Sequence, residues 1–328
     1  MVYVSNAGSA EISALRLDPD GTLRPVRTIP VGGAVMPLAV TADGQRLYAS
    51  LRSEPYSVAC FDIDSSTGEL TELATVPLPD NMAYLSVDRS GRYLLAASYT
   101  GSVVSVSALR GDGRVGPPVT VLATPPHAHS IVTDPTNRFV FATALGGDGI
   151  LRYRFEADSG LLTPEPDASV RTKPGAGPRH LLFHPSGRFV YVSNELDGTV
   201  GAYHFDASTG DLTAIDIYNA TPEGGTDPWT AELRCTPDGR YLYVSERRSS
   251  TLAGFGIDPD SGALRPLGHT ATETCPRGFD IDPGGRYLVA AGQDSDSLTV
   301  HAIDPRTGTL TALGRHRVGR DPNWVEIV

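Results

Sequence analysis

Short runs of apolar, often β-branched residues alternate along the whole chain with turns rich in glycine, aspartate and proline. No stretch shows the apolar spacing of an amphipathic helix. In the segment 37–77, which we take as one unit, four runs are separated by turn residues. They cover residues 38–41, 46–50, 58–63 and 70–76. The pattern predicts four short strands and no helix.

This unit recurs at a nearly constant interval. One marker is a turn glycine, usually followed within a few residues by Leu-Thr or Leu-Arg, at positions 21, 68, 113, 160, 210, 262 and 308. A second marker is a turn residue that in most copies precedes arginine and an apolar run, at positions 44, 91, 137, 187, 239 and 285. Both markers recur every 45 to 52 residues, an interval typical of β-propeller blades. Seven turn glycines therefore predict seven blades.

The repeat predicts an all-β fold, a seven-bladed β-propeller with four antiparallel strands per blade, formed by residues 1–328 as a single domain. The Trp-Asp dipeptide of the commonest propellers is absent. Residues 3–6 align with 191–194 as a second strand, and residues 324–328 have the pattern of a first strand. The C-terminal strand is thus expected to complete the first blade, which leaves no open sheet edge.

Charge and composition argue against several classes of function. The formal net charge is −11 and no run of basic residues occurs, so nucleic-acid binding is not expected. No apolar run approaches the roughly 18 residues of a membrane span, so we expect no membrane association. Lys173 is the single lysine among 27 basic residues. Any site for an anion must therefore be built from guanidinium groups.

Three cysteines, Cys60, Cys235 and Cys275, lack C-x-x-C spacing. This odd number argues against both a disulfide framework and a structural zinc site. The sequence starts directly in a strand-like run with no basic stretch before it, so we expect no export signal. Together these features predict a cytoplasmic protein. Nothing in the sequence indicates its oligomeric state.

Propeller geometry predicts which polar residues share one end of the ring, because loops between second and third strands open at the same end as the connections between blades. The loops carry Asn6, Arg52, Tyr99, Asp148, Glu195, Arg247 and Gln293. The connections carry His127, His129, Arg179, His180 and Arg277. The opposite end collects Asp-Gly and Thr-Gly hairpins, which are ordinary turn chemistry.

Four arginines of this set are expected to create a local positive charge suited to a carboxylate or a phosphate: Arg52, Arg179, Arg247 and Arg277. The substrate is therefore predicted to be a small anion. The residues expected to bind it are Arg277, Arg52, His180, Tyr99 and Gln293. The alternative is that each arginine pairs with a neighbouring carboxylate, such as Asp148 or Glu246.

Glu195 and His129 are the residues of this set that can move a proton near neutral pH. Neither a Gly-x-Ser-x-Gly elbow nor a reactive-cysteine context occurs, so activation of water is favoured over a covalent route. A purely structural Glu195 that bridges two arginines is the alternative. His127 and His129 have the spacing of a metal pair, but no third ligand lies nearby, and we predict neither a metal nor another cofactor.

Two long stretches resemble a known family, the seven-bladed lactonases, and in particular its bacterial 6-phosphogluconolactonase branch. Gly-Ala-Gly-Pro-Arg-His at 175–180, with Phe-His-Pro at 183–185 and Asn-Glu-Leu at 194–196, is similar to the central signature of the family. Residues 272–279 and 290–293 are similar to its last blades. The resemblance extends over the whole chain. It implies hydrolysis of a sugar-acid lactone to 6-phosphogluconate in the pentose phosphate pathway, without a required metal.

The resemblance also implies catalytic roles. Related fungal carboxymuconate cyclases share the fold and use a histidine, two arginines and a glutamate, which correspond here to His129, Arg179, Arg247 and Glu195. We expect Arg179 to stabilise the oxyanion and Glu195 to accept the proton of water. His129 would orient the water or protonate the leaving oxygen, and these two roles can be exchanged. The chain departs from the family pattern at Glu246 and Arg234.

Two other functions fit the same sequence. One is a lactonase, isomerase or muconate-type cyclase that acts on another sugar acid. The other is a non-catalytic propeller used as an interaction platform, because a fold alone does not define a function. A platform has no need of arginines around one glutamate and one histidine, so the predicted cluster favours an enzyme.

Overall fold

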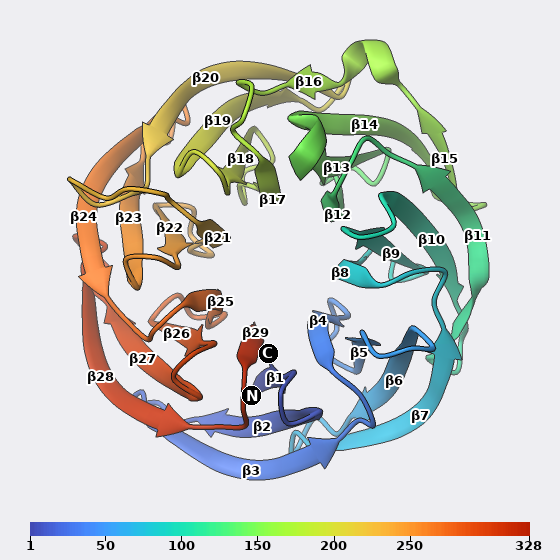
Figure 1. The fold of residues 1–328 in the computed structure, drawn as a ribbon, viewed down its shortest axis with the longest axis horizontal. Coiled ribbons are helices and arrows are strands. Elements are labelled where there is room, and N and C mark those ends of the chain that lie inside the picture. Colours follow the sequence, from blue (N-terminus) through green and yellow to red (C-terminus); the bar gives the residue numbers. More distant parts are fainter.

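The computed structural model describes all 328 residues, and nearly all its regular structure is β. Seven antiparallel sheets stand radially around one axis (Figure 1). Six sheets have four strands, and one has a short fifth strand at its edge. The predicted seven-bladed propeller is confirmed. No helix in the structure is long and apolar enough to cross a membrane.

The first three blades contain one strand from the C-terminus and eleven from the N-terminal part of the chain. From the axis outward, the first blade has β29 (Pro322–Ile327), β1 (Val2–Asn6), β2 (Glu11–Leu17) and β3 (Leu23–Pro30). In the same order, the second has β4 (Val35–Val40), β5 (Arg46–Leu51), β6 (Ser57–Ile63) and β7 (Leu70–Pro77). The third has β8 (Met82–Val87), β9 (Tyr93–Ser98), β10 (Val103–Leu109) and β11 (Val115–Ala123).

The fourth blade has β12 (Ala128–Thr133), β13 (Phe139–Ala144), β14 (Gly149–Glu156) and β15 (Leu161–Pro164), with β16 (Val170–Arg171) also pairing with β14. The fifth has β17 (Pro178–Phe183), β18 (Phe189–Asn194), β19 (Thr199–Asp206) and β20 (Asp211–Asn219). The sixth has β21 (Thr230–Cys235), β22 (Tyr241–Glu246), β23 (Thr251–Ile257) and β24 (Leu264–Ala271). The seventh has β25 (Pro276–Ile281), β26 (Tyr287–Gly292), β27 (Ser297–Ile303) and β28 (Leu310–Arg317).

The strands predicted for the segment 37–77 lie within three residues of β4 to β7. The largest difference is at β4, which includes Pro37, because the strand accommodates this proline at an irregularity of register. Three short elements of the fourth blade were not predicted, namely β16 and the 3₁₀ helices η1 (Leu145–Gly147) and η2 (Pro166–Ala168). They are too short to give a periodic pattern.

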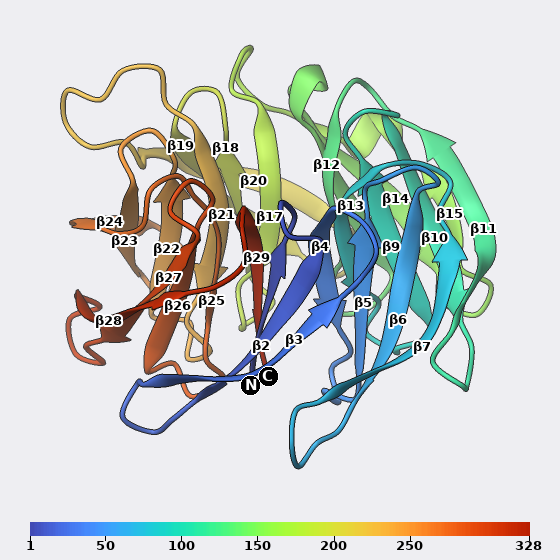
Figure 2. The same ribbon diagram turned by 60° about the horizontal axis from the view of Figure 1, so that its bottom comes forward.

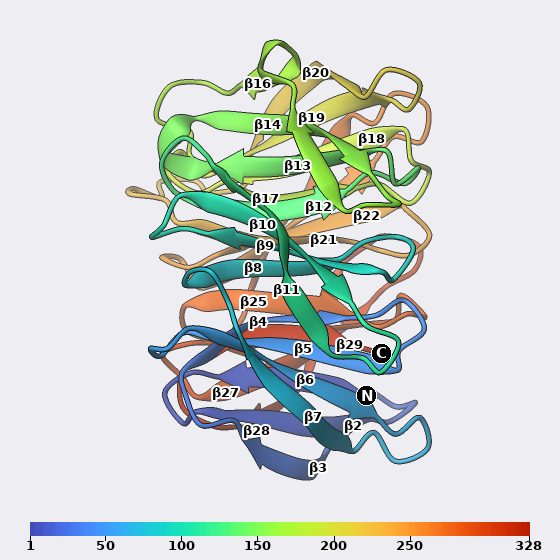
Figure 3. The ribbon, with the colours of Figure 1, turned by 90° about the vertical axis from the view of Figure 1, so that its right-hand side faces the viewer.

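Both chain ends lie in the first blade. β29 pairs antiparallel with β1, with Val325 opposite Val4, and the N–H of Val328 donates to the carbonyl oxygen of Met1 over 2.9 Å. Figures 2 and 3 show the two termini side by side at one end of the ring. Val4 and Val325 are buried in one cluster with Val289 of β26. The predicted closure is confirmed, and the last strand also contributes to the core between the first and seventh blades.

The repeated turn glycine has a structural role between blades. In four blades a tyrosine hydroxyl on the second strand donates, over 2.7 to 3.1 Å, to the carbonyl oxygen of the turn glycine in the next blade. Gly308 accepts from Tyr243 in this way. Its φ is 72°, and a Cβ at this position would lie 2.4 Å from the Tyr241 ring. A side chain would be both strained and in collision, which explains why glycine recurs.

A second glycine is needed where the seventh blade approaches the closing strand. A Cβ on Gly278 of β25 would lie 2.6 Å from the carbonyl oxygen of Asn323 and 3.0 Å from Cα of Trp324 in β29. Both are backbone atoms of a paired strand, so they cannot move aside as the end of a flexible side chain can. The closing strand therefore depends on the absence of a side chain at this position.

Substituting Gly278→Ala is expected to destabilise the fold by about 1–3 kcal/mol, because the added methyl group forces β25 and β29 apart. Thermal unfolding followed by circular dichroism should show a melting temperature lower by a few degrees. Gly111→Ala is the matched control, since a Cβ there meets no atom within 4 Å. Equal melting temperatures for the two variants would contradict the prediction.

Candidate active site

An irregularity of register near the start of each innermost strand positions the site. Each of the seven strands has one residue more than its partner at this point. Such β-bulges redirect side chains. In β12, β17 and β25 the unpaired residues are His129, Arg179 and Arg277. Three of the predicted site residues thus project from equivalent positions around the axis.

Glu195, directly after β18, lies at the centre of the site. Its Oε2 forms ion pairs with Nε of Arg179 over 2.8 Å and with Nη2 of Arg247 over 2.9 Å. Its Oε1 accepts a hydrogen bond from Nε1 of Trp229 over 3.0 Å. Burial by itself raises the pKa of Glu195, but the two guanidinium charges and the indole hydrogen bond outweigh it, so the pKa is lowered overall. The group is therefore a carboxylate that bridges two arginines.

The side chain of Arg247 is held by contacts with Trp229 and Thr230, at the start of the sixth blade. Its Cζ lies 3.6 Å from the centroid of the Trp229 ring, a cation–π contact. Its Nε and Nη2 donate to the carbonyl oxygens of Trp229 and Thr230 over 3.1 and 3.2 Å. Burial and then the charge of Arg179 lower the pKa of Arg247 to about 9. Trp229 was not predicted from the sequence, although it lies in a connection between blades of the kind that supplied Arg179.

Arg277 differs from the other three arginines of the site, because its guanidinium group makes no hydrogen bond or ion pair within the chain, whereas those of Arg52, Arg179 and Arg247 do. Burial and then the charges of Arg179 and Arg52 lower the pKa of Arg277 to about 10. Arg52 forms no ion pair either, and its Nε donates to Oδ1 of Asn81 over 2.5 Å. Burial lowers the pKa of Arg52 as well. Two of the four arginines therefore form no ion pair, although the charge of Asp321 lies near enough to both to oppose the lowering of their pKa.

The carboxylates expected to neutralise the arginines have other partners. Asp148 accepts hydrogen bonds from the N–H groups of Gly175 and Gly177. Glu246 accepts from the N–H groups of Trp229 and Ser249. Neither pairs with an arginine of the site. Arg179 and Arg247 do pair with a carboxylate, that of Glu195, so the alternative of paired arginines holds for these two and not for Arg52 and Arg277. Of the four arginines around Glu195, only Arg179 and Arg247 form ion pairs with it, so positive charge is in excess there.

His129 is held as a neutral imidazole. It is 4% exposed, and burial, followed by the charges of Arg179, His180 and Arg277, lowers its pKa well below 6.5. Its Nδ1 is buried and has no hydrogen-bond partner. Its Nε2 also has no partner within the chain and is the ring nitrogen that is not enclosed. His129 therefore presents a free nitrogen beside the arginines.

Tyr99 and Gln293 lie beside these groups. The Tyr99 ring stacks on His127, with centroids 4.2 Å apart, and is nearly perpendicular to the His129 ring, with centroids 5.8 Å apart. Nε2 of Gln293 donates to Oδ1 of Asp321 over 2.7 Å. Asp321 was not predicted, although it also precedes an innermost strand.

His180 is buried below Arg179, with an exposed fraction of 1%. Its Nε2 lies 3.1 Å from Nη1 of Arg179, and its Nδ1 lies 3.1 Å from Oε1 of Glu232. Both ring nitrogens are thus engaged within the chain. Direct contact between His180 and a substrate stays a prediction. Glu232, which was not predicted from the sequence, extends the polar contacts of the site along the axis.

Comparison with known protein families identifies the family to which this chain belongs. A family model described as "Lactonase, 7-bladed beta-propeller" matches residues 2–327. The chain belongs to this lactonase family. The family resemblance inferred from residues 175–196 and 272–293 is thereby confirmed.

Individual lactonase relatives match over nearly their full lengths. The 6-phosphogluconolactonase of Pectobacterium carotovorum is 41% identical over 329 residues, which cover 100% of this chain and 98% of the relative. The 6-phosphogluconolactonase of Erwinia tasmaniensis is 38% identical, with 100% and 98% covered. Among solved structures, the periplasmic gluconolactonase of Pseudomonas aeruginosa superposes with a TM-score of 0.92 at 31% identity, covering 99% of this chain and 98% of its own.

Proposed function

We propose that this chain is a carboxylic-ester hydrolase of the pentose phosphate pathway that converts 6-phospho-D-glucono-1,5-lactone to 6-phosphogluconate. The observation that carries the proposal is the excess of positive charge around Glu195, in which Arg277 and Arg52 form no ion pair. Such a site suits a lactone that carries an anionic group. The names of relatives 38–41% identical over their full lengths support the same substrate.

Arg179 is suited to stabilise the tetrahedral intermediate. When water adds to the lactone carbonyl, the carbonyl oxygen becomes negatively charged, and a fixed guanidinium beside it lowers the barrier. Nε and Nη1 of Arg179 are directed to Glu195 and His180. Its Nη2 makes no hydrogen bond or ion pair within the chain and can therefore donate to the oxyanion.

The geometry favours His129 over Glu195 as the group that accepts the proton of water. Nε2 of His129 is free, whereas both oxygens of Glu195 already have partners. The charges of Arg179 and Arg277 lower the pKa of His129, so an anionic substrate that offsets these charges raises it again. The imidazolium then returns the proton to the ring oxygen as the C–O bond breaks. Glu195 holds the arginines and balances the transient positive charge.

Arg277 and Arg52 are proposed to hold the phosphate, with Tyr99 and Gln293 beside the sugar. Arg277→Ala is expected to raise KM by about 10- to 100-fold, because one charge-assisted hydrogen bond is lost, and to change kcat only a few-fold. Arg27→Ala is the matched control, since Arg27 is more than half exposed and pairs only with Glu69. Steady-state kinetics decide: an unchanged KM with a collapsed kcat would show that Arg277 acts in the chemical step.

The function is tested by following acid release from fresh lactones with a pH indicator, after subtraction of spontaneous hydrolysis. We expect kcat/KM for the phosphorylated lactone to exceed that for glucono-1,5-lactone by about tenfold or more, because a hydrogen bond between an arginine and the phosphate strengthens binding by at least this factor. The second candidate is a lactonase for unphosphorylated sugar acids, favoured by the likeness to a periplasmic gluconolactonase. Equal kcat/KM values would support that candidate, and no acceleration of either lactone would refute both.

We also propose a cytoplasmic location. Three free cysteines support it, because unpaired thiols are typical of reducing compartments. Fractionation of cells that express the full natural chain tests this location directly, and recovery of the protein from the periplasm would contradict it.

A further inference from the structure

A layer of buried side chains closes the axis beneath the arginines. Tyr84, His180 and Trp324 each lie one residue beyond the bulge of their strand, and their ring centroids are 5.0 to 5.6 Å apart. Glu232 has the corresponding place in β21, because its N–H, like that of His180, donates to a serine hydroxyl on the neighbouring second strand. Glu232 is 1% exposed. Burial of a charged carboxyl group at this depth costs free energy, so other interactions or a function must account for it.

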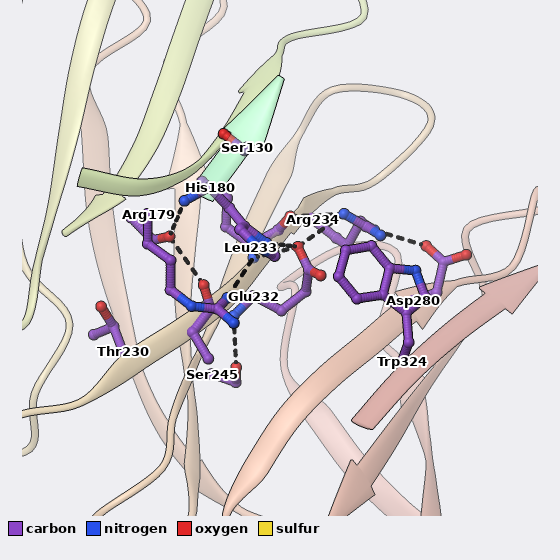
Figure 4. A network of polar contacts seen from close by, with 12 residues as sticks. Ser130, Arg179, His180, Thr230, Glu232, Leu233, Arg234, Ser245, Asp280 and Trp324 are labelled. Carbon is purple, nitrogen blue, oxygen red and sulfur yellow. Dashed lines mark hydrogen bonds and ion pairs between the residues drawn. The ribbon is translucent and has the colours of Figure 1, made fainter. Parts of the chain in front are cut away.

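The contacts of Glu232 continue the site inward (Figure 4). Its Oε1 lies 3.1 Å from Nδ1 of His180, 2.8 Å from Nη1 of Arg234 and 3.0 Å from the N–H of Leu233. On the other side, Nε2 of His180 lies 3.1 Å from Nη1 of Arg179. A polar chain therefore runs from Glu195 through Arg179 and His180 to Glu232.

The chemistry of its members fixes the direction of every bond. A guanidinium group can only donate, so Nε2 of His180 must accept from Arg179. Burial and then the charges of Arg179 and Arg234 lower the pKa of His180 well below 6.5, so the ring is neutral and its single proton is on Nδ1. That N–H donates to Glu232. Because Arg179 keeps its protons, the chain orients groups and does not conduct protons.

Balancing the charge of Arg234 does not by itself account for Glu232. Nε of Arg234 also pairs with Oδ1 of Asp280 over 3.0 Å, and Oε1 of Glu326 lies 4.0 Å from its Nη2. Three carboxyl groups thus surround one guanidinium group, where one would suffice. The contact that distinguishes Glu232 from the other two is its hydrogen bond with His180.

We infer that Glu232 is a positioning residue of the proposed hydrolysis. It fixes the Nδ1–H tautomer of His180, and His180 in turn holds Nη1 of Arg179 while Glu195 holds Nε. Arg179 is then fixed at two points, with its remaining N–H groups directed to the reacting carbonyl. His180 thereby has a supporting role in place of direct substrate contact. The inference rests on the proposed function, because its kinetic test uses the proposed substrate. The test of the His180 tautomer needs no substrate and does not depend on that function.

The kinetic test compares three variants. Glu232→Leu removes the acceptor at similar volume and is expected to lower kcat about 10- to 100-fold with little change in KM, because Arg179 is no longer fixed. Glu232→Gln keeps an acceptor oxygen for His180 and should restore most of kcat. Asp280→Asn alters the opposite side of Arg234 and should leave kcat within a few-fold of the original. Equal losses in Glu232→Leu and Asp280→Asn would overturn the inference, as would an unchanged kcat in Glu232→Leu.

The tautomer is measured independently of activity. Long-range ¹H–¹⁵N spectra of the unsubstituted chain, assigned for His180 with a His180→Gln variant, should show a neutral ring protonated on Nδ1. A proton on Nε2 would overturn the inference even if Glu232→Leu fails to fold. If the lactone assay is negative while Nδ1 carries the proton, the proposed function fails and the hydrogen-bond assignment stands.

Discussion

Glu195→Gln is expected to lower kcat by about 10²–10⁴, because the arginines that stabilise the transition state lose their position and His129 becomes a poorer general base. The substitution keeps the shape of the side chain but removes the charge that bridges Arg179 and Arg247. The two guanidinium groups then repel each other and move apart. The unbalanced charge of Arg179 also lowers the pKa of His129 further, which makes the imidazole a poorer base. Steady-state kinetics with the phosphorylated lactone measure the loss.

Glu223→Gln is the control for this experiment, since Glu223 is exposed in the connection between β20 and β21. Circular dichroism must show that the Glu195 variant remains folded, because removal of a partner from buried arginines also reduces stability. A folded variant with full activity would remove Glu195 from the mechanism. The pH profile tests the assignment of both proton transfers to His129: the acidic limb of kcat/KM should persist in Glu195→Gln and disappear in His129→Asn.

Deletion of Trp324–Val328 is expected to abolish soluble folding. The deletion exposes the inner edge of β1 and removes Trp324 and Val325, which are 4% and 1% exposed, from the core. The loss is comparable to the whole stability of a typical domain, about 5–15 kcal/mol. An exposed strand edge also promotes aggregation. Soluble yield and size-exclusion chromatography measure the outcome.

Deletion of Val328 alone is the matched control, because its side chain is 37% exposed and lies beyond the end of β29. This shorter deletion should leave the protein soluble with a slightly lower melting temperature. A monodisperse chain without Trp324–Val328, with the original melting temperature, would contradict the account of ring closure.

The fold could be predicted from the sequence because the same pattern of strands and turns recurs in every blade. Each blade repeats the turn glycine, and the contact of Tyr243 with Gly308 shows why glycine is needed at that point. The convergence of His129, Arg179, Glu195, Arg247 and Arg277 followed from topology alone, since equivalent loops of a ring meet at one end.

The finer arrangement could not be predicted, because it depends on bulges and on contacts between blades. Arg179 and His180 are neighbours in sequence, yet the bulge in β17 directs Arg179 to the site and leaves His180 below it. The partner of His180, Glu232, comes from a different blade. The role of Trp229 has no signal in the sequence, because an isolated tryptophan in a connection belongs to no recurring pattern. Residue types show the available chemistry, but only the register of neighbouring strands shows which groups touch.

The pairing of β1 with β29 also bears on how the protein is made. On the ribosome, β1 emerges before all the other strands and its partner β29 after them, so the first blade must wait until the other six have been synthesised. Contacts so distant in sequence slow folding, and an unpaired strand is prone to associate with other nascent chains. Chaperone binding to the growing polypeptide should therefore persist until β29 has emerged, and a circular permutant that begins between two complete blades should rely on it less.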